Sequence, residues 1–333
     1  MIRLRHLLGQ TSLLMLFLLA RISPAEAAFF VDGDTVTHRP RVALVLGGGG
    51  AKGAAHVGAL KVLEQVGIQP DIIVGTSIGA IVGGLHSIGY SAADLDTLFR
   101  SQQWLQLFTR EAIRGNAIKD MLDRLTSRSP SKEGEGLPDY KRNQEGTQSD
   151  SLSAPSVRSE GELFACIAAD LPTLSEVVLT DDSLARNMRA SMAIPGVFRP
   201  VKSGDYVLLD GGLLNNLPVD VARRMGADIV IAIDLTVNHH EKNDDDEDFD
   251  LSEIFDTTKV KGLLGWLLNR PDFTKYKQNC QDADLLINPP LNGYAATSFA
   301  RQRIEEMILL GEQAARNHIG ELQKIQAKLT PEP

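Results

Sequence analysis

The segment 75–79 (GTSIG) has the pattern G-x-S-x-G, in which the central serine acts as a nucleophile. In such an elbow the serine occupies a sharp turn between a strand and a helix, and small neighbours are needed because a side chain would collide with the turn. The apolar run 72–74 comes directly before this motif, and a helix of small residues follows it. This context favours a nucleophilic role for Ser77 over the alternative, an ordinary glycine-rich turn with a capping serine.

A second glycine-rich segment, residues 47–53 (GGGGAKG), follows the apolar run 42–46 and opens a helix. It does not suit a dinucleotide site, because the next strand ends without an acidic residue for a ribose. It does not suit a phosphate-binding P-loop either, because Gly53 is followed by Ala54 rather than by lysine. Backbone N–H groups at a helix N-terminus suit an oxyanion hole, in which Lys52 would hold the loop or add positive potential.

A nucleophilic serine also needs a base. The apolar segment 206–209 leads into Asp210 and a pair of glycines, a pattern that places a carboxylate at the end of a strand. The alternative base is His239 or His240, since either would complete the Ser–Asp–His chain order of an α/β-hydrolase.

Short apolar runs that alternate with helical segments predict the elements around these motifs. We expect a three-layer α/β/α sandwich with a largely parallel central sheet. The expected strands cover residues 42–46, 72–74, 163–169, 206–209, 229–233 and 285–287.

The composition excludes several classes of protein. The 333 residues are 43% hydrophobic and 23% charged, which excludes a mainly disordered chain. The net charge of −9 argues against nucleic acid as a partner. Two cysteines cannot form a disulfide framework, and Cys166 lies in an apolar run typical of a buried thiol.

Residues 1–27 have the basic, apolar and A-x-A regions of a signal peptide, so we expect an exported protein, periplasmic or secreted. The alternative is an uncleaved membrane anchor. The folded domain is expected at 41–325, with polar and disordered loops at 127–161 and 239–253. The acidic run in the second loop lacks the spacing of a calcium-binding loop.

One apolar segment, residues 262–268 (GLLGWLL), has a basic residue on each side. The sequence favours a buried helix here, and a segment that contacts a membrane surface is the alternative.

Together, the glycine loop, the elbow and the aspartate turn resemble the patatin-like phospholipase family, most closely its bacterial members related to neuropathy target esterase. The segments 189–198 (RASMAIPGVF) and 215–219 (NNLPV) are also similar to this family. The residues that match its three central motifs are Gly48, Gly49, Gly50, Lys52, Gly53, Gly75, Ser77, Gly79, Asp210, Gly211 and Gly212.

The resemblance implies a catalytic dyad without histidine, with Ser77 as the nucleophile and Asp210 as its base. Gly48, Gly49, Gly50 and Lys52 would form the oxyanion hole. The implied reaction is hydrolysis of fatty acyl esters of phospholipids or lysophospholipids through an acyl-enzyme, with no metal or organic cofactor.

One segment departs from the family pattern. Much of the helical, apolar region that shapes the acyl pocket in relatives is replaced by the polar stretch 127–161. This departure puts the substrate range in question and leaves a catalytically weak lipid-binding relative as one alternative. The other alternative, a Ser–His–Asp carboxylesterase, rests on His239 or His240.

Overall fold

The computed structural model describes residues 39–107, 116–127, 163–180, 183–236 and 273–329. From Pro40 onward these residues belong to one compact unit, residues 40–333.

The strands form a single mixed sheet in the order β5-β6-β3-β2-β1-β7-β8, and β4 pairs with β3 outside this path. The five strands β3, β2, β1, β7 and β8 run parallel to one another. Both β4 and β6 run antiparallel to β3, and β5 runs antiparallel to β6. The strands are β1 (Val42–Leu46), β2 (Ile72–Thr76), β3 (Leu163–Asp170), β4 (Ser175–Leu179), β5 (Val201–Ser203), β6 (Tyr206–Asp210), β7 (Ile229–Ile233) and β8 (Leu285–Ile287).

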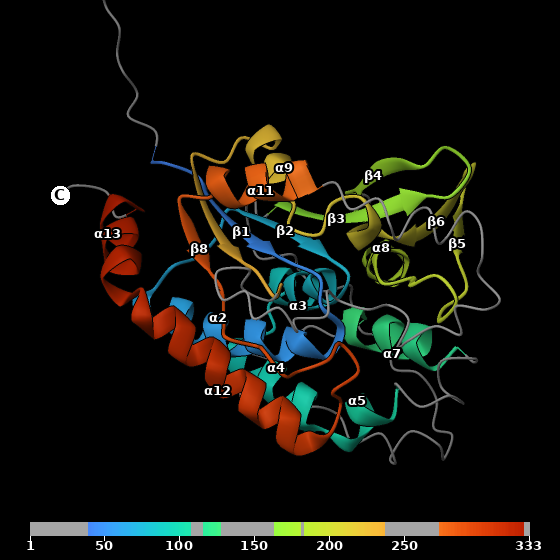
Figure 1. Cartoon of the computed structure of the whole chain (residues 1–333), viewed down its shortest axis with the longest axis horizontal. Helices are drawn as coiled ribbons and strands as arrows, with labels where there is room; N and C mark the ends of the chain where they lie inside the picture. The colour runs from blue at the N-terminus through green and yellow to red at the C-terminus, as the bar shows by residue number, and fades with distance from the viewer. Residues whose placement is uncertain (1–38, 108–115, 128–162, 181–182, 237–272, 330–333) are drawn as a thin grey trace, which may run out of the picture. The chain divides into compact units, whose positions relative to one another are not determined.

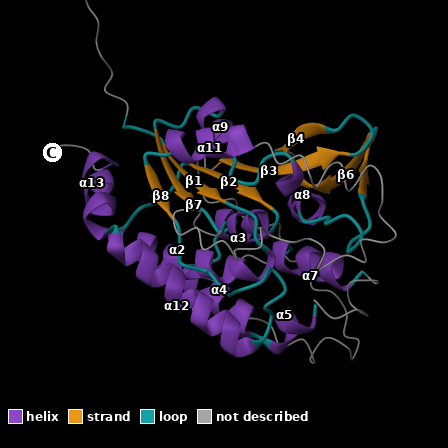
Figure 2. Ribbon diagram, viewed as in Figure 1, coloured by secondary structure: helices purple, strands orange, loops and turns teal. Residues whose placement is uncertain are grey.

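Helices cover both faces of the sheet (Figures 1 and 2). On one face lie α2 (Ala54–Val66), α3 (Ile78–Ser87), α4 (Ala92–Arg100) and α12 (Arg301–Asn317). On the other face lie α9 (Val219–Arg224) and α11 (Phe273–Asp282). The remaining helical segments are η2 (Gly50–Gly53), α5 (Gln102–Gln106), α7 (Ala117–Thr126), α8 (Leu184–Ser191), η4 (Gly211–Leu213) and α13 (Ile319–Leu329).

Strand β1 shows how the sequence produces this arrangement. Leu44 and Leu46 pack in the apolar cluster that contains residues of α2 and α12, whereas Ala43 and Val45 pack in the cluster that contains residues of α9. Successive side chains of a strand point to opposite faces, so a strand covered on both sides must be apolar throughout. The three-layer sandwich with a largely parallel sheet is therefore confirmed.

Several expectations fall outside the described residues: the signal peptide at 1–27, nearly all of the loop 127–161, the loop 239–253 and the apolar segment 262–268. Where the structure is described, none of the helices has both the length and the apolar character needed to cross a bilayer. Cys166 is fully buried, as expected.

Candidate active site

Ser77 occupies a strained turn between β2 and α3. Its φ of 55° and ψ of −119° lie in a region that residues with a side chain rarely adopt. A β-carbon at Gly79 would lie 2.1 Å from the carbonyl oxygen of Leu46, and one at Gly75 would lie 2.4 Å from the carbonyl oxygen of Gly79. The two flanking glycines are thus needed for the chain to turn this closely, and the turn has the geometry of a nucleophile elbow.

The last residue of β6, Asp210, contacts this serine. Ser77 Oγ donates a hydrogen bond to Asp210 Oδ2 over 2.7 Å, and the N–H of Gly212 donates to Asp210 Oδ1 over 2.8 Å. Register explains how the two residues meet: β3 lies between β2 and β6, and it pairs Ile167 with Thr76 and Ala168 with Asp210. A β-carbon at Gly211 would lie 2.2 Å from the carbonyl oxygen of Ile167, so the chain can turn against β3 here only at a glycine.

Burial changes the proton affinity of Asp210. Asp210 is 7% exposed, and this desolvation raises the pKa of its carboxyl group to about 6. The hydrogen bonds from Ser77 and Gly212 act in the opposite direction and lower the pKa. At neutral pH the carboxylate is ionised yet more basic than an exposed aspartate. A general base works best with a pKa near the working pH, so this carboxylate is suited to accept a proton from Ser77.

The glycine loop lies beside the elbow, because β1 and β2 are neighbours in the sheet. A β-carbon at Gly48 would lie 3.3 Å from Cβ of Ser77. The N–H of Gly48 donates to the carbonyl oxygen of Asn216 over 3.1 Å, whereas the N–H groups of Gly49 and Gly50 make no hydrogen bond to the described residues. Of the three glycine amides, those of Gly49 and Gly50 therefore have no acceptor among the described residues.

Lys52 is buried in this loop, with 6% of its surface exposed. Desolvation lowers the pKa of its ammonium group, and the nearby carboxylate of Asp234 partly offsets this effect. The side chain thus places a buried amino group within the glycine loop.

A buried histidine that the sequence did not single out anchors the same loop. His56, at the start of α2, has no exposed surface, and its Nε2 lies 2.8 Å from the carbonyl oxygen of Gly47. Desolvation lowers its pKa to about 4, so the ring is neutral at pH 7 and donates its Nε2 proton to this carbonyl. No spacing rule identifies such a contact, because it depends on how α2 packs behind β1.

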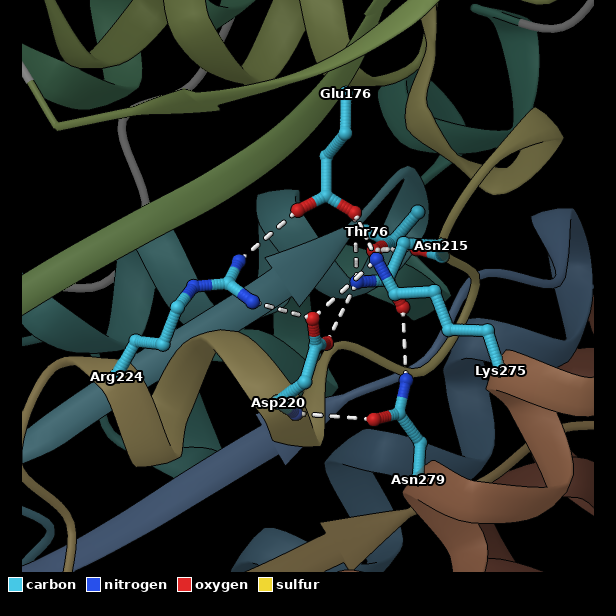
Figure 3. A network of polar contacts seen from close by, with 7 residues as sticks. All are labelled: Thr76, Glu176, Asn215, Asp220, Arg224, Lys275 and Asn279. Carbon is cyan, nitrogen blue, oxygen red and sulfur yellow. Dashed lines mark hydrogen bonds and ion pairs between the residues drawn. The ribbon is translucent and has the colours of Figure 1, made fainter.

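A polar network supports the turn that follows Asp210 (Figure 3). Thr76, the neighbour of the serine, donates through Oγ1 to the carbonyl oxygen of Asn215 over 2.9 Å. The amide group of Asn215 donates to Glu176 and Asp220 over 2.9 and 2.8 Å and accepts a hydrogen bond from Asn279 over 3.0 Å. The charged members of this network are Glu176, Asp220, Arg224 and Lys275. The network joins β2, β4, α9 and α11 to the aspartate turn.

The alternative bases, His239 and His240, lie outside the described residues. Within the described part of the chain, the hydroxyl of Ser77 donates to Asp210, and the buried rings of His56 and His86 contact backbone carbonyl groups instead. The described residues also contain no group of three or more histidines, cysteines and acidic residues that could hold a metal ion.

Comparisons with known proteins identify the family. Residues 44–223, more than half of the chain, match the family model for patatin-like phospholipases. Mouse patatin-like phospholipase domain-containing protein 7 is 39% identical over 198 residues, which are 58% of this chain and 13% of the mouse protein. An uncharacterized NTE family protein of Mycobacterium bovis is 33% identical over 213 residues, which are 64% of this chain and 53% of that protein.

Among solved structures, VipD from Legionella pneumophila is similar with a TM-score of 0.45 and 13% identity, over 85% of this chain and 67% of VipD. The match to the mouse protein spans only about an eighth of that protein's length. Because the family model matches more than half of its residues, this chain belongs to the patatin-like phospholipase family.

Proposed function

We propose that this protein is a serine lipid acyl hydrolase that cleaves fatty acyl esters of phospholipids or lysophospholipids through a dyad of Ser77 and Asp210. The observation that carries the proposal is the 2.7 Å hydrogen bond from Ser77 Oγ to a buried carboxylate whose pKa is about 6. Membership of the patatin-like phospholipase family supports a lipid ester as the substrate.

In the first half of the reaction, Ser77 Oγ attacks the acyl carbonyl carbon while its proton passes to Asp210 Oδ2. The negative charge that develops on the carbonyl oxygen is stabilised by the open N–H groups of Gly49 and Gly50. The tetrahedral intermediate collapses to an acyl-enzyme, and the leaving lysolipid or glycerol alcohol takes the proton from Asp210.

In the second half, Asp210 takes a proton from a water molecule, which attacks the acyl-enzyme. The fatty acid leaves, and the proton returns to Ser77 Oγ. The same carboxylate thus acts as base and then as acid in each half-reaction.

The test is release of fatty acid from a panel of lysophospholipids, phospholipids and short-chain esters. We expect Ser77→Ala to lower kcat at least about 10³-fold and Asp210→Asn about 10²–10⁴-fold, because one removes the nucleophile and the other the base. The double variant His239→Ala/His240→Ala should keep wild-type activity. Loss of activity in that double variant would support the Ser–His–Asp alternative.

We also propose that the chain is exported after cleavage between Ala27 and Ala28. The basic, apolar and A-x-A pattern of residues 1–27 supports this proposal. N-terminal sequencing of the protein recovered from its natural source tests it.

We further propose that residues 262–268 contact the lipid surface. The apolar run around Trp266 supports this proposal. A blue shift of Trp266 fluorescence on adding anionic vesicles tests it.

A further inference from the structure

The segment from Ser191 to Ala193, at the end of α8, contacts both members of the proposed dyad. Ser191 Oγ accepts a hydrogen bond from the backbone N–H of Ser77 over 2.9 Å. Two residues later, the carbonyl oxygen of Ala193 accepts a hydrogen bond from the backbone N–H of Asp210 over 3.0 Å. Ser77 and Asp210 come from different strands, so this segment is a physical link between them besides their own side-chain contact.

The hydroxyl of Ser191 makes two hydrogen bonds and is fully buried. It donates to the carbonyl oxygen of Ile167 on β3 over 2.6 Å while it accepts from Ser77, and no part of the residue is exposed. Ile167 is also the residue of β3 that pairs with Thr76. The hydroxyl therefore connects the strand next to β2 with the first residue after β2.

The backbone at Ser77 needs such a partner. The residue stands at the N-terminus of α3, where the first N–H groups of a helix have no acceptor within the helix. Its positive φ is an unfavourable conformation that persists only where surrounding contacts hold it. Without the Ser191 hydroxyl, a buried N–H would remain unpaired, and the turn could relax toward a less strained conformation that moves Oγ away from Asp210.

We propose that Ser191 is a positioning residue of the hydrolytic reaction: its hydroxyl holds the strained turn at Ser77, and the adjoining Ala193 carbonyl holds Asp210, so that Oγ and the carboxylate stay in hydrogen-bonding contact. This inference rests on the proposed function, because it assigns Ser191 a task in that chemistry. Ser191 itself touches neither the substrate nor the transferred proton.

A purely structural role would give a different result, and the chain offers a matched control. Ser87, the last residue of α3, is buried and donates a hydrogen bond from its hydroxyl to the carbonyl oxygen of Gly84 over 2.8 Å. Ser87→Ala removes a buried serine–carbonyl hydrogen bond, as Ser191→Ala does, but it leaves the contacts of Ser77 and Asp210 intact. Ser191→Thr keeps a hydroxyl and serves as the conservative replacement.

The experiment measures kcat and KM for a soluble ester such as p-nitrophenyl butyrate, together with the rate at which a fluorophosphonate labels Ser77. All rates are normalised to the folded fraction found by circular dichroism. We expect Ser191→Ala to lower kcat and the labelling rate about 10–100-fold with KM within about twofold, since small misplacement of reacting groups costs this much. Ser191→Thr should recover most of the loss, and Ser87→Ala should react like wild type.

Wild-type kcat in folded Ser191→Ala, or equal losses in Ser191→Ala and Ser87→Ala, would overturn the inference and leave the dyad in place. If Ser191→Ala does not fold, Ser191→Cys replaces it, because a thiol occupies the site but hydrogen-bonds more weakly. Wild-type kcat in folded Ser191→Cys would overturn the inference in the same way. A wild-type protein without activity, or an active Ser77→Ala variant, would instead refute the proposed function itself.

Discussion

Replacement of Asp210 by asparagine is expected to stabilise the fold at alkaline pH while it removes activity. Asparagine can keep both contacts of this side chain, since its amide can donate to Ser77 Oγ and its oxygen can accept from the N–H of Gly212. The substitution does, however, remove a buried negative charge. Its effect on the free energy of unfolding therefore depends on pH.

The magnitude follows from the pKa of Asp210, which rises from 3.8 to about 6 on burial. A group whose pKa is higher in the folded state contributes its full stabilisation at a pH below its unfolded pKa. This stabilisation is lost as the pH rises through the folded pKa. The difference between the two pKa values means that the ionised form costs about 3 kcal/mol at pH 8, of which about 2 kcal/mol develops between pH 4 and pH 8. Asparagine donates to Ser77 Oγ instead of accepting from it, so the Ser77 hydroxyl loses its acceptor at a cost of about 1 kcal/mol. The net gain in stability of Asp210→Asn at pH 8 is therefore about 2 kcal/mol.

The assay is urea unfolding followed by circular dichroism at pH 4 and pH 8. Asp96→Asn is the matched control, because hydrogen bonds and charges from Lys61 and Arg100 outweigh the burial of Asp96 and lower its pKa. This control should lose stability at pH 8, whereas Asp210→Asn should gain it. If Asp210→Asn is less stable than wild type at pH 8, or if its effect is the same at both pH values, the argument for a buried carboxylate of raised pKa is wrong.

Three further measurements test other parts of the structure. With Asp210 as the base, kcat/KM should rise through a midpoint near pH 6 and reach about one tenth of its plateau at pH 5; a flat profile from pH 5 to 8 would contradict this. His56 has a pKa of about 4 in the folded protein and 6.5 in the unfolded chain, so the unfolded state binds a proton first as the pH falls. Wild type should therefore lose about 3 kcal/mol of stability between pH 7 and pH 4, and urea titrations of His56→Gln should lack this loss. Gly311→Ala should destabilise the protein by about 1–3 kcal/mol in thermal unfolding, because the added β-carbon would lie 1.9 Å from the carbonyl oxygen of Ala55. The control Gly320→Ala should be neutral or stabilising, because open space surrounds that position.

The sequence identifies those parts of the fold that produce a strong local pattern. The buried parallel strands are apolar along their whole length, and the elbow and the aspartate turn require glycine where the chain passes close to another backbone. Such constraints appear directly in residue type. The strands expected at 42–46, 72–74 and 229–233 are present within one or two residues of their predicted bounds.

The two short antiparallel strands show the limit of this approach. Strand β5 has three residues, none of them buried, and β4 has one buried residue among five. Strands this exposed carry no continuous apolar signal, because the hydrogen bonds to β3 and β6 define them rather than burial.

The supporting contacts of the site are also absent from any local pattern. Ser191 reaches Ser77 across 114 positions of the chain, and Asn216 reaches Gly48 across 168. The side chain of Asn216 donates to the carbonyl oxygen of Gly48, and the carbonyl oxygen of Asn216 accepts from the N–H of Gly48. The amide of Gly48 is therefore occupied, whereas the amides of Gly49 and Gly50 have no acceptor among the described residues. Only the packing of the folded chain distinguishes these three glycines.

The most direct test of the central claim is to identify the residue that carries the acyl group. The protein is mixed with a lysophospholipid, quenched in acid within the first turnover, digested and analysed by mass spectrometry. We predict a fatty acyl adduct on Ser77 that is absent from Ser77→Ala and that accumulates more slowly in Asp210→Asn. An adduct on another residue, or full fatty acid release by Ser77→Ala, would contradict the account.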